Sequence, residues 1–386
     1  MSDPITPIGA ATAVDVTGDE IVRVWTDGLT GAELELEPLT DADVAATGCP
    51  AQDRYRDPRK RVPVEDRGRC VGDAYDIKRT LGFGGFASVR ECKHIPTQQD
   101  VCVKVIGKDR AGKTYATGLV EAGGYEMLLE ISKQPHRNIV RYFDIFESTT
   151  RYYVVMEQLQ GCELTVALTE YGPKWSEKNC AGVMFDVLTV LSYLHHVVGV
   201  YHRDVKLENL RFRGRTSGPF AGRKVGGGLV LLDFGLCRFI GQPFDGRYAG
   251  TQLYKAPEVS LSKEDGGFSC AVDLWAAGIV LFILLTGDMP FEEKDALQGL
   301  AAERAEESIA SFENEMAEKG RGVPQALLRG LLQADPVLRW DATRALTDEW
   351  LELAPDLPAA ETYAKAIKKS RESTRKTMLA LESGEY

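Results

Sequence analysis

Short stretches rich in β-branched and aromatic residues follow one another in the first half of the chain. Residues 75–94 predict two strands around a glycine turn, and 101–107, 138–148 and 151–159 predict three more strands. Residues 118–134 are typical of a helix, with paired glycines in the first half. The pattern therefore predicts five strands and one helix in this part of the chain.

Helical patterns dominate after Gly161. Residues 180–197 predict a long helix, 274–286 form the longest apolar run, and further helices are predicted as far as Trp350. At 13 residues the apolar run is too short to span a bilayer, so it predicts a buried core helix. A strand-rich segment with one helix, followed by a helix-rich segment, is typical of an α+β fold with two lobes.

The two ends of the chain differ from its middle. Residues 1–72 mix short apolar stretches with Gly, Thr and Asp, and they form either a poorly ordered extension or a few strands or turns packed on the main domain. Residues 352–386 are rich in helix formers and carry a basic face with an apolar stripe. The predicted domain occupies 73–351, with a small lobe at 75–157 and a large lobe at 160–351.

Net charge and cysteine spacing argue against several classes of protein. The formal charge of -11, without a long basic stretch, disfavours nucleic-acid binding, which depends on phosphate neutralisation. The eight cysteines include no C-x-x-C pair, which disfavours a zinc site and favours a reducing compartment. Without a secretory signal or a glycine at position 2, we expect a cytoplasmic protein with no membrane attachment, and the nucleus stays open as a location.

A glycine-rich turn joins the first two predicted strands. Residues 82–89 fit G-x-G-x-x-A-x-V, in which glycines let backbone N–H groups approach phosphate oxygens; the alternative is an ordinary hairpin with glycine bulges. Lys104 in the next strand either faces solvent or pairs with phosphates held by that loop. Its carboxylate partner would come from the predicted helix, where Glu126 is the candidate and Glu121 and Glu130 compete.

A polar octapeptide carries the strongest chemical signal. Residues 202–209 read H-R-D-V-K-L-E-N and bring Asp204, Lys206 and Asn209 into one loop. The alternative interpretation is a polar surface loop without a chemical role. Phosphoryl transfer needs a carboxylate for the hydroxyl proton, a cation near the phosphoryl group and an oxygen ligand for Mg²⁺, and these three residues supply them. Asp233, between an apolar strand and a glycine, is well placed to hold a metal between phosphates.

These segments stand in the order typical of one family. From about Tyr75 to Trp350 the chain resembles the eukaryotic protein kinase superfamily, through the glycine loop, V-C-V-K-V, H-R-D-V-K-L-E-N, D-F-G, A-P-E, the D-x-W-x-x-G pattern starting at Asp273, and the late Arg339. The resemblance implies the two-lobed kinase fold and transfer of the γ-phosphate of Mg-ATP to a protein hydroxyl. It implies ATP and Mg²⁺ as cofactors and proteins bearing Ser or Thr as substrates.

The resemblance also assigns roles to residues in the catalytic machinery. Lys104 would bind the α and β phosphates and pair with Glu126. Asp204 would be the catalytic base, with Lys206 beside the γ-phosphate. The implied ligands of Mg²⁺ are Asn209 and Asp233.

Further roles follow from the same resemblance. The implied nucleotide-binding residues are Leu81, Gly82, Phe83, Gly84, Gly85, Val89 and Lys104, Met156 as gatekeeper, and Glu157 and Leu159 in the hinge. Glu163 and Glu208 complete the predicted binding set and lie where basophilic kinases place carboxylates for an Arg three residues before the target. Ile283 replaces a further such carboxylate, so we expect a moderate preference for one upstream Arg. Glu258 and Arg339 would form a buried ion pair with a structural role.

Several details refine the resemblance. Lys206, and Thr251 in G-T-x-x-Y-x-A-P-E, favour serine and threonine over tyrosine as acceptors. Ala87 replaces the third glycine of the loop, a change that we expect to preserve activity. The activation segment has no Ser or Thr before Thr251, whose position in the family contacts the catalytic Asp. We therefore expect activity without Ser/Thr phosphorylation of this segment, with Asp245 or phosphorylated Tyr248 as substitutes.

The sequence leaves alternatives open for two segments, the insertion and the C-terminal tail, and for the activity. The Gly- and Arg-rich insertion at 211–228 is either a flexible surface loop or a docking or regulatory loop. The tail resembles the autoinhibitory and calmodulin-binding tails of the calcium/calmodulin-dependent group, and alternatively it packs on the large lobe or is solvated. A pseudokinase-type scaffold is the rival function; it predicts damage to the catalytic residues, which are intact. A small-molecule or lipid kinase is disfavoured by the A-P-E closure.

Overall fold

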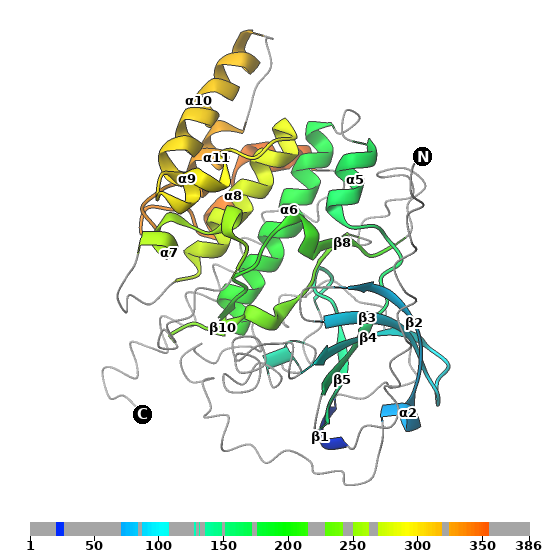
Figure 1. Ribbon diagram of the computed structural model, residues 1–386. Helices are drawn as coiled ribbons and strands as arrows, with labels where there is room; N and C mark the ends of the chain where they lie inside the picture. Colours follow the sequence, from blue (N-terminus) through cyan, green and yellow to red (C-terminus); the bar gives the residue numbers. More distant parts are fainter. Residues whose placement is uncertain are drawn as a thin grey trace, which may run out of the picture. The chain divides into compact units, whose positions relative to one another are not determined.

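The chain forms two compact units. The computed structural model describes residues 21–26, 71–83, 87–107, 127–128, 131, 136–148, 151–171, 176–214, 228–241, 250–261, 269–318 and 324–354. Unit 1 comprises Met1–Gly31, Pro63–Ala111 and Phe143–Gln158, and unit 2 comprises Ala32–Val62, Gly112–Tyr142 and Leu159–Tyr386. Strands dominate unit 1 and helices dominate unit 2 (Figure 1), as the sequence predicts.

A six-stranded sheet forms unit 1, in the order β1-β5-β6-β4-β3-β2. Its strands are β1 (Ile21–Thr26), β2 (Tyr75–Phe83), β3 (Ala87–His94), β4 (Asp100–Gly107), β5 (Tyr142–Ser148) and β6 (Arg151–Glu157). The pairs β1–β5, β2–β3, β3–β4 and β4–β6 are antiparallel. The two strands predicted around the glycine turn are therefore confirmed as β2 and β3.

One face of this sheet supplies the hydrophobic core of unit 1. Alternate residues of β4 point to the same side because side chains alternate along a strand, and Val101, Val103 and Val105 are all buried there. Tyr75 and Phe146 pack edge to face in the same cluster, with ring centroids 5.9 Å apart. The cluster thus joins residues of β2, β4 and β5, which are not neighbours in the sheet.

Helices make up most of unit 2. They are α5 (Leu164–Tyr171), α6 (Glu177–Tyr193), α7 (Pro257–Leu261), α8 (Ala271–Thr286), α9 (Glu293–Leu297), α10 (Ala301–Glu318), α11 (Gln325–Leu331) and α12 (Ala342–Ala345). Two short antiparallel pairs lie among them, β7 (Val200–Tyr201) with β10 (Arg238–Phe239) and β8 (Leu210–Phe212) with β9 (Leu229–Leu231). The remaining short elements are α2 (Val71–Ala74) in unit 1, a π-helix at Leu194–Val198, and 3₁₀ turns at Leu207–Asn209, Phe234–Leu236, Gln252–Tyr254 and Glu349–Leu353.

Helices α6 and α8 pack against each other in the core of unit 2. Ser176 caps the start of α6 by accepting a hydrogen bond from the Asn179 N–H at 3.3 Å. Gly287 ends α8 in a left-handed conformation at φ 86°, which glycine adopts without steric cost. Among the described helices, Glu177–Val198 is long and apolar enough to cross a membrane, but 94% of its most apolar 18-residue stretch is buried, as in a core helix. The predicted burial of 274–286 is confirmed, apart from its last two residues.

Some predicted segments differ from the structure or fall outside it. Of the predicted helix at 118–134, only Met127, Leu128 and Ile131 are described, and all three are helical. The strand predicted from 138 begins at Tyr142, because the preceding residues pair with β9 instead. Gly112–Tyr142, predicted to belong to the small lobe, groups with unit 2.

The extensions are described only in part. Of residues 1–70, the structure describes 21–26, which form β1 on the edge of the sheet, as the packed-extension alternative predicts. The basic tail from 355, the centre of the insertion at 215–227 and the stretch at 242–249 lie outside the described residues.

Candidate active site

A buried aspartate at the start of α8 organises the H-R-D segment. Asp273 is 1% exposed, and its carboxylate accepts hydrogen bonds from the backbone N–H groups of His202 at 2.7 Å and Arg203 at 2.8 Å. These bonds stabilise Arg203 in a left-handed conformation at φ 73°, which costs energy for a residue with a side chain. The third partner of Asp273 is His195, whose Nε2 lies 2.8 Å from Oδ2.

These partners keep Asp273 ionised. Burial by itself raises the pKa of this carboxyl, but the hydrogen bond from His195, the electrostatic attraction of the two imidazoles at 195 and 202 and the backbone N–H of His202 outweigh it and hold the pKa below its usual value. The sequence pattern includes Asp273 but gives no sign of His195, which lies 78 residues away.

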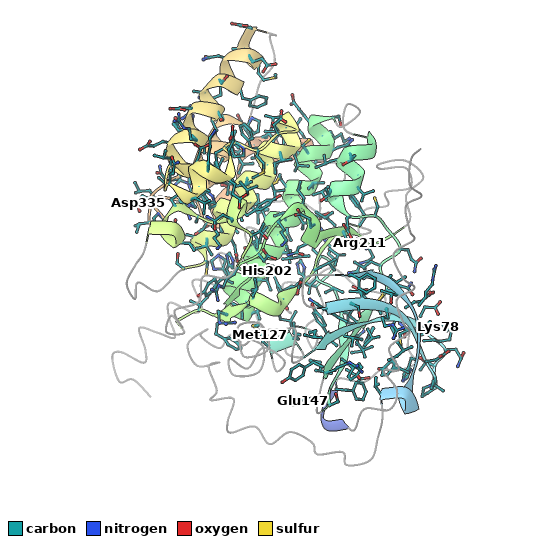
Figure 2. The ribbon with its side chains drawn as sticks, viewed as in Figure 1. Lys78, Met127, Glu147, His202, Arg211 and Asp335 are labelled. Carbon is teal, nitrogen blue, oxygen red and sulfur yellow. The ribbon has the colours of Figure 1, made fainter. Side chains whose placement is uncertain are left out.

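His202 joins this segment to the D-F-G segment. Its Nε2–H donates to the Leu232 carbonyl at 2.9 Å, and its Nδ1 accepts from the Asp204 N–H at 3.3 Å, so both contacts fit one neutral tautomer. Burial lowers the pKa of His202 and favours that neutral form. The ring of Phe234 packs edge-on against it at 4.9 Å. Figure 2 shows His202 among the packed side chains of unit 2.

Asp204, Lys206 and Thr251 form a closed polar network. Thr251 Oγ1 donates to Asp204 Oδ1 at 2.9 Å and accepts from Lys206 Nζ at 2.7 Å. Lys206 Nζ also lies 2.8 Å from Asp204 Oδ2, and the Thr251 N–H donates to Oδ1 at 3.2 Å. The contact between Thr251 and the predicted catalytic Asp is therefore confirmed. The side chains of Asp204 and Lys206 are 11% and 19% exposed, so a polar group from outside can still reach them.

Close backbone packing brings Thr251 to this position. Gly250 has φ +105°, and a Cβ added to it would lie 2.7 Å from the Arg203 carbonyl oxygen. Any larger residue would therefore push the 250–255 segment away from Asp204. The sequence shows this glycine in its motif, but the need for it arises from a contact between two loops.

Asn209 and Asp233 offer oxygen ligands on either side of the β8–β9 pair. The Asn209 amide nitrogen donates to the Asp204 backbone carbonyl at 2.8 Å and to Asp204 Oδ2 at 2.9 Å, so its amide oxygen is the atom left for a cation. Asp233 lies two residues after the end of β9, with φ 59°. Amide and carboxylate oxygens suit Mg²⁺, which binds one or two protein ligands together with phosphates and water. No group of three or more His, Cys, Asp or Glu side chains that could hold a metal ion occurs among the described residues.

Unit 1 carries the other half of the predicted residue set. Lys104 lies in β4, opposite Val89 of β3 and Val154 of β6. Gly82 lies opposite Val89, and no atom falls within 4 Å of a Cβ added to it, so the strand surface is open there. Leu81 and Phe83 on either side are 45% and 78% exposed. Met156 and Glu157 form the end of β6, opposite Cys102 and Val101.

The remaining predicted residues are distributed as follows. Gly84, Gly85 and Glu126 lie outside the described residues. Leu159 starts the last segment of unit 2, and Glu208 is exposed in the H-R-D segment at 202–209. Glu163 lies 3.6 Å from the guanidinium of Arg211, which Figure 2 labels.

The predicted structural ion pair is confirmed. The Arg339 guanidinium donates two hydrogen bonds to the Glu258 carboxylate, at 2.7 and 2.9 Å. It also donates to backbone carbonyls, including that of Ala271 at 2.8 Å, and lies 5.2 Å from the centre of the Trp275 ring. With its side chain 0% exposed, Arg339 joins α7, α8 and the loop before α12.

This arrangement and the fold define a protein kinase domain. The family model for the protein kinase domain matches residues 75–351, and the chain belongs to this family, with its two-lobed α+β fold. The chain is 30% identical over 300 residues to the human serine/threonine-protein kinase DCLK3, covering 77% of this chain and 43% of that protein.

Other relatives carry kinase names as well. The human hormonally up-regulated neu tumor-associated kinase is 30% identical over 320 residues, covering 80% of this chain and 41% of that protein. CBL-interacting protein kinase 3 of Oryza sativa subsp. japonica is 30% identical over 311 residues, covering 78% and 62%. The chain thus spans less than two thirds of each of these relatives.

Proposed function

We propose that this chain is a serine/threonine protein kinase that transfers the γ-phosphate of ATP, with Mg²⁺, to hydroxyl groups of protein substrates. The observation that carries the proposal is the closed network of Asp204, Lys206 and Thr251, with Asn209 bonded to the same aspartate. A scaffold without turnover has no need for each of these groups to be intact and mutually bonded. The names of the kinase relatives support the same activity.

The network suits a reaction in which a hydroxyl oxygen forms a bond to phosphorus while the bond to the leaving phosphate breaks. Asp204 accepts or orients the proton of the incoming hydroxyl. Lys206 places a positive charge beside the phosphoryl group, where negative charge accumulates. Asn209 and Asp233 would hold Mg²⁺, which neutralises the phosphates when bound.

Unit 1 would bind the nucleotide. Lys104 would pair with its phosphates, with Glu126 as the proposed orienting partner. The backbone around Gly82 would approach the phosphates, as the open space at this position allows. Met156 and Glu157 at the end of β6 would contact the adenine.

We propose in addition a moderate preference for an Arg upstream of the acceptor. Glu208 is exposed and free to meet such a cation, whereas Glu163 already has Arg211 as an internal counterion at 3.6 Å. An incoming Arg would have to share Glu163 with Arg211, which is why the preference is moderate. An array in which peptides with Arg and Ala three residues before the acceptor react equally would refute it.

The activity is tested by transfer of the γ-phosphate from Mg-ATP to a Ser/Thr peptide library. Asp204→Asn keeps the size of the side chain but removes the proton acceptor, and we expect transfer to fall about 10²- to 10⁴-fold. Asp288→Asn, at an exposed position beyond α8, is the matched control and should transfer at the rate of the unaltered protein. Equal transfer by Asp204→Asn would contradict the role of Asp204 as proton acceptor, and no transfer by the unaltered full chain would favour the scaffold.

A further inference from the structure

The 250–255 segment borders the place where a substrate hydroxyl must arrive. Thr251 bonds to Asp204 through both its backbone N–H and its hydroxyl. Consecutive residues of a peptide are about 3.8 Å apart, so the neighbours of an acceptor at Asp204 must pass close to this segment. Side chains of the 250–255 segment are therefore placed to select them.

Lys255 is the charged side chain of this segment. It lines a pocket together with Asp204, Arg203 and Asp273, and the rest of the lining includes apolar residues such as Val259 and Val272. Lys255 is partly buried, and its Nζ donates to the Gln252 amide oxygen at 3.3 Å. Among the described residues, no carboxylate lies within ion-pairing distance of this ammonium group.

The surroundings of Lys255 favour an added negative charge. Burial lowers the pKa of its ammonium group, and the positive charge of Arg203 lowers it further, against the opposing charge of Asp204. A cation that has lost water and faces another cation is stabilised by an anion at close range.

The carboxylates already in the pocket do not supply that anion. Asp204 is bonded to Thr251, Lys206 and Asn209. Asp273 is bonded to His195 and to two backbone N–H groups. Both carboxylates are thus committed to holding the catalytic segment.

We propose that Lys255, assisted by Arg203, forms a subsite for an Asp or Glu side chain that directly adjoins the acceptor Ser or Thr in the protein substrate. The subsite rests on the proposed kinase function and specifies its substrates. Together with the proposed upstream Arg, it predicts acceptor sequences in which a basic residue precedes the hydroxyl and an acidic residue lies next to it.

Matched peptides and a charge swap test the subsite. Peptides that carry Asp, Asn or Lys at each position flanking the acceptor are compared by kcat/KM on the full chain. We expect an Asp peptide to exceed its Asn counterpart about tenfold, mainly through KM, as a charge-assisted contact made on binding would give. Lys255→Gln should bring this ratio to about one, and Lys255→Glu should favour the Lys peptide.

The control is Lys178→Gln, which removes an exposed charge from the first turn of α6. The opposite end of α6 leads toward the H-R-D segment, and Lys178, the second of its 17 residues, lies roughly 22 Å from that end. This variant should keep the preference for Asp. A ratio of Asp to Asn that is near one in the unaltered protein, or unchanged in both Lys255 variants, would overturn the subsite.

Peptide binding separates the subsite from the proposed activity. Fluorescence anisotropy of labelled Asp and Asn peptides, with and without Mg-ATP, needs no turnover. Tighter binding of the Asp peptide that is lost in Lys255→Gln supports the subsite even when transfer is absent. Transfer that continues with no difference in binding between the two peptides overturns the subsite and leaves the kinase function standing.

Discussion

Hydrogen bonds to Asp204 determine what its carboxylate can do. Thr251 supplies two donors, Lys206 an ammonium group and Asn209 an amide N–H. Charge-assisted bonds of this kind fix the carboxylate in one orientation, as its proposed role toward the proton of an incoming hydroxyl requires. The orientation of the Asp204 carboxylate depends on Thr251, because the Thr251 hydroxyl bonds to both Asp204 and Lys206.

Thr251→Ala tests that role. Losing the hydroxyl leaves Lys206 and Asp204 without their shared partner, and we expect kcat to fall about 10- to 100-fold, since such bonds contribute roughly 1.5–3 kcal/mol. Thr251→Ser keeps the hydroxyl and should retain most of the activity. Initial rates at saturating ATP and peptide provide the measurement, and equal rates for the Ala and Ser variants would contradict the role.

Elements are easier to predict than their ends and their long-range contacts. The strands on both sides of the glycine turn and the buried helix α8 follow from patterns within a few residues. The strand predicted from 138 starts late, because Asn138 accepts from the Leu231 N–H at 2.8 Å and donates through Nδ2 to the Leu229 carbonyl at 2.6 Å. These contacts join residues about ninety positions apart, and no local pattern encodes them.

Some residues of the candidate site can likewise be predicted from the local sequence, whereas others depend on long-range contacts. The residues of the H-R-D segment share one loop, so their spacing along the chain is enough to reveal them. His195 and the need for glycine at position 250 arise only when α8 and the 250–255 segment meet that loop. The proposed role of Lys255 likewise follows from its neighbours in the pocket and not from its position in a sequence motif.

Packing between α11 and the loop before α12 gives a test at the level of elements. A Cβ added to Gly330 would lie 2.3–2.7 Å from atoms of the Trp340 ring. We expect Gly330→Ala to lower the free energy of unfolding by about 1–3 kcal/mol, because a packed indole ring has little room to move. Gly214→Ala, with no atom within 4 Å of the added Cβ, should change it by less than about 0.5 kcal/mol. Urea unfolding followed by circular dichroism compares the two, and an equal effect would show that the ring relaxes.

At the scale of the whole molecule, buried ionisable groups link folding to pH. Burial lowers the pKa of His136 to about 3, with help from the charges of Arg137 and Arg213. Its ring stacks on Tyr193 at 4.7 Å, and its Nδ1 accepts from the Asn138 N–H. Burial lowers the pKa of His202 as well. The folded protein therefore contains two imidazoles that stay neutral where an unfolded chain would protonate them.

We expect stability to fall on mild acidification for this reason. A histidine with a lowered pKa contributes fully above its unfolded value of about 6.5, and the contribution is lost as the pH falls toward the folded value. His136 by itself should remove about 1.4 kcal/mol per pH unit below that point. His136→Gln should be less stable than the unaltered protein at pH 7.5 but lose stability less steeply between pH 6.5 and 5. Urea titrations at several pH values measure both slopes, and identical slopes would rule out His136 as the titrating group.

The β8–β9 pair closes the base of the insertion. The Arg213 N–H donates to the Gly228 carbonyl at 3.2 Å, and Phe212 lies opposite Leu229. Asn209 precedes this closed base and Asp233 follows it, so the two proposed Mg²⁺ ligands keep their spacing whatever length of chain lies between. Doubling the length of a flexible loop costs only about 0.6 kcal/mol in closure entropy. The insertion is thus a position where evolution, or an experimenter adding a fluorescent reporter, can lengthen the chain without changing the spacing of the two proposed Mg²⁺ ligands.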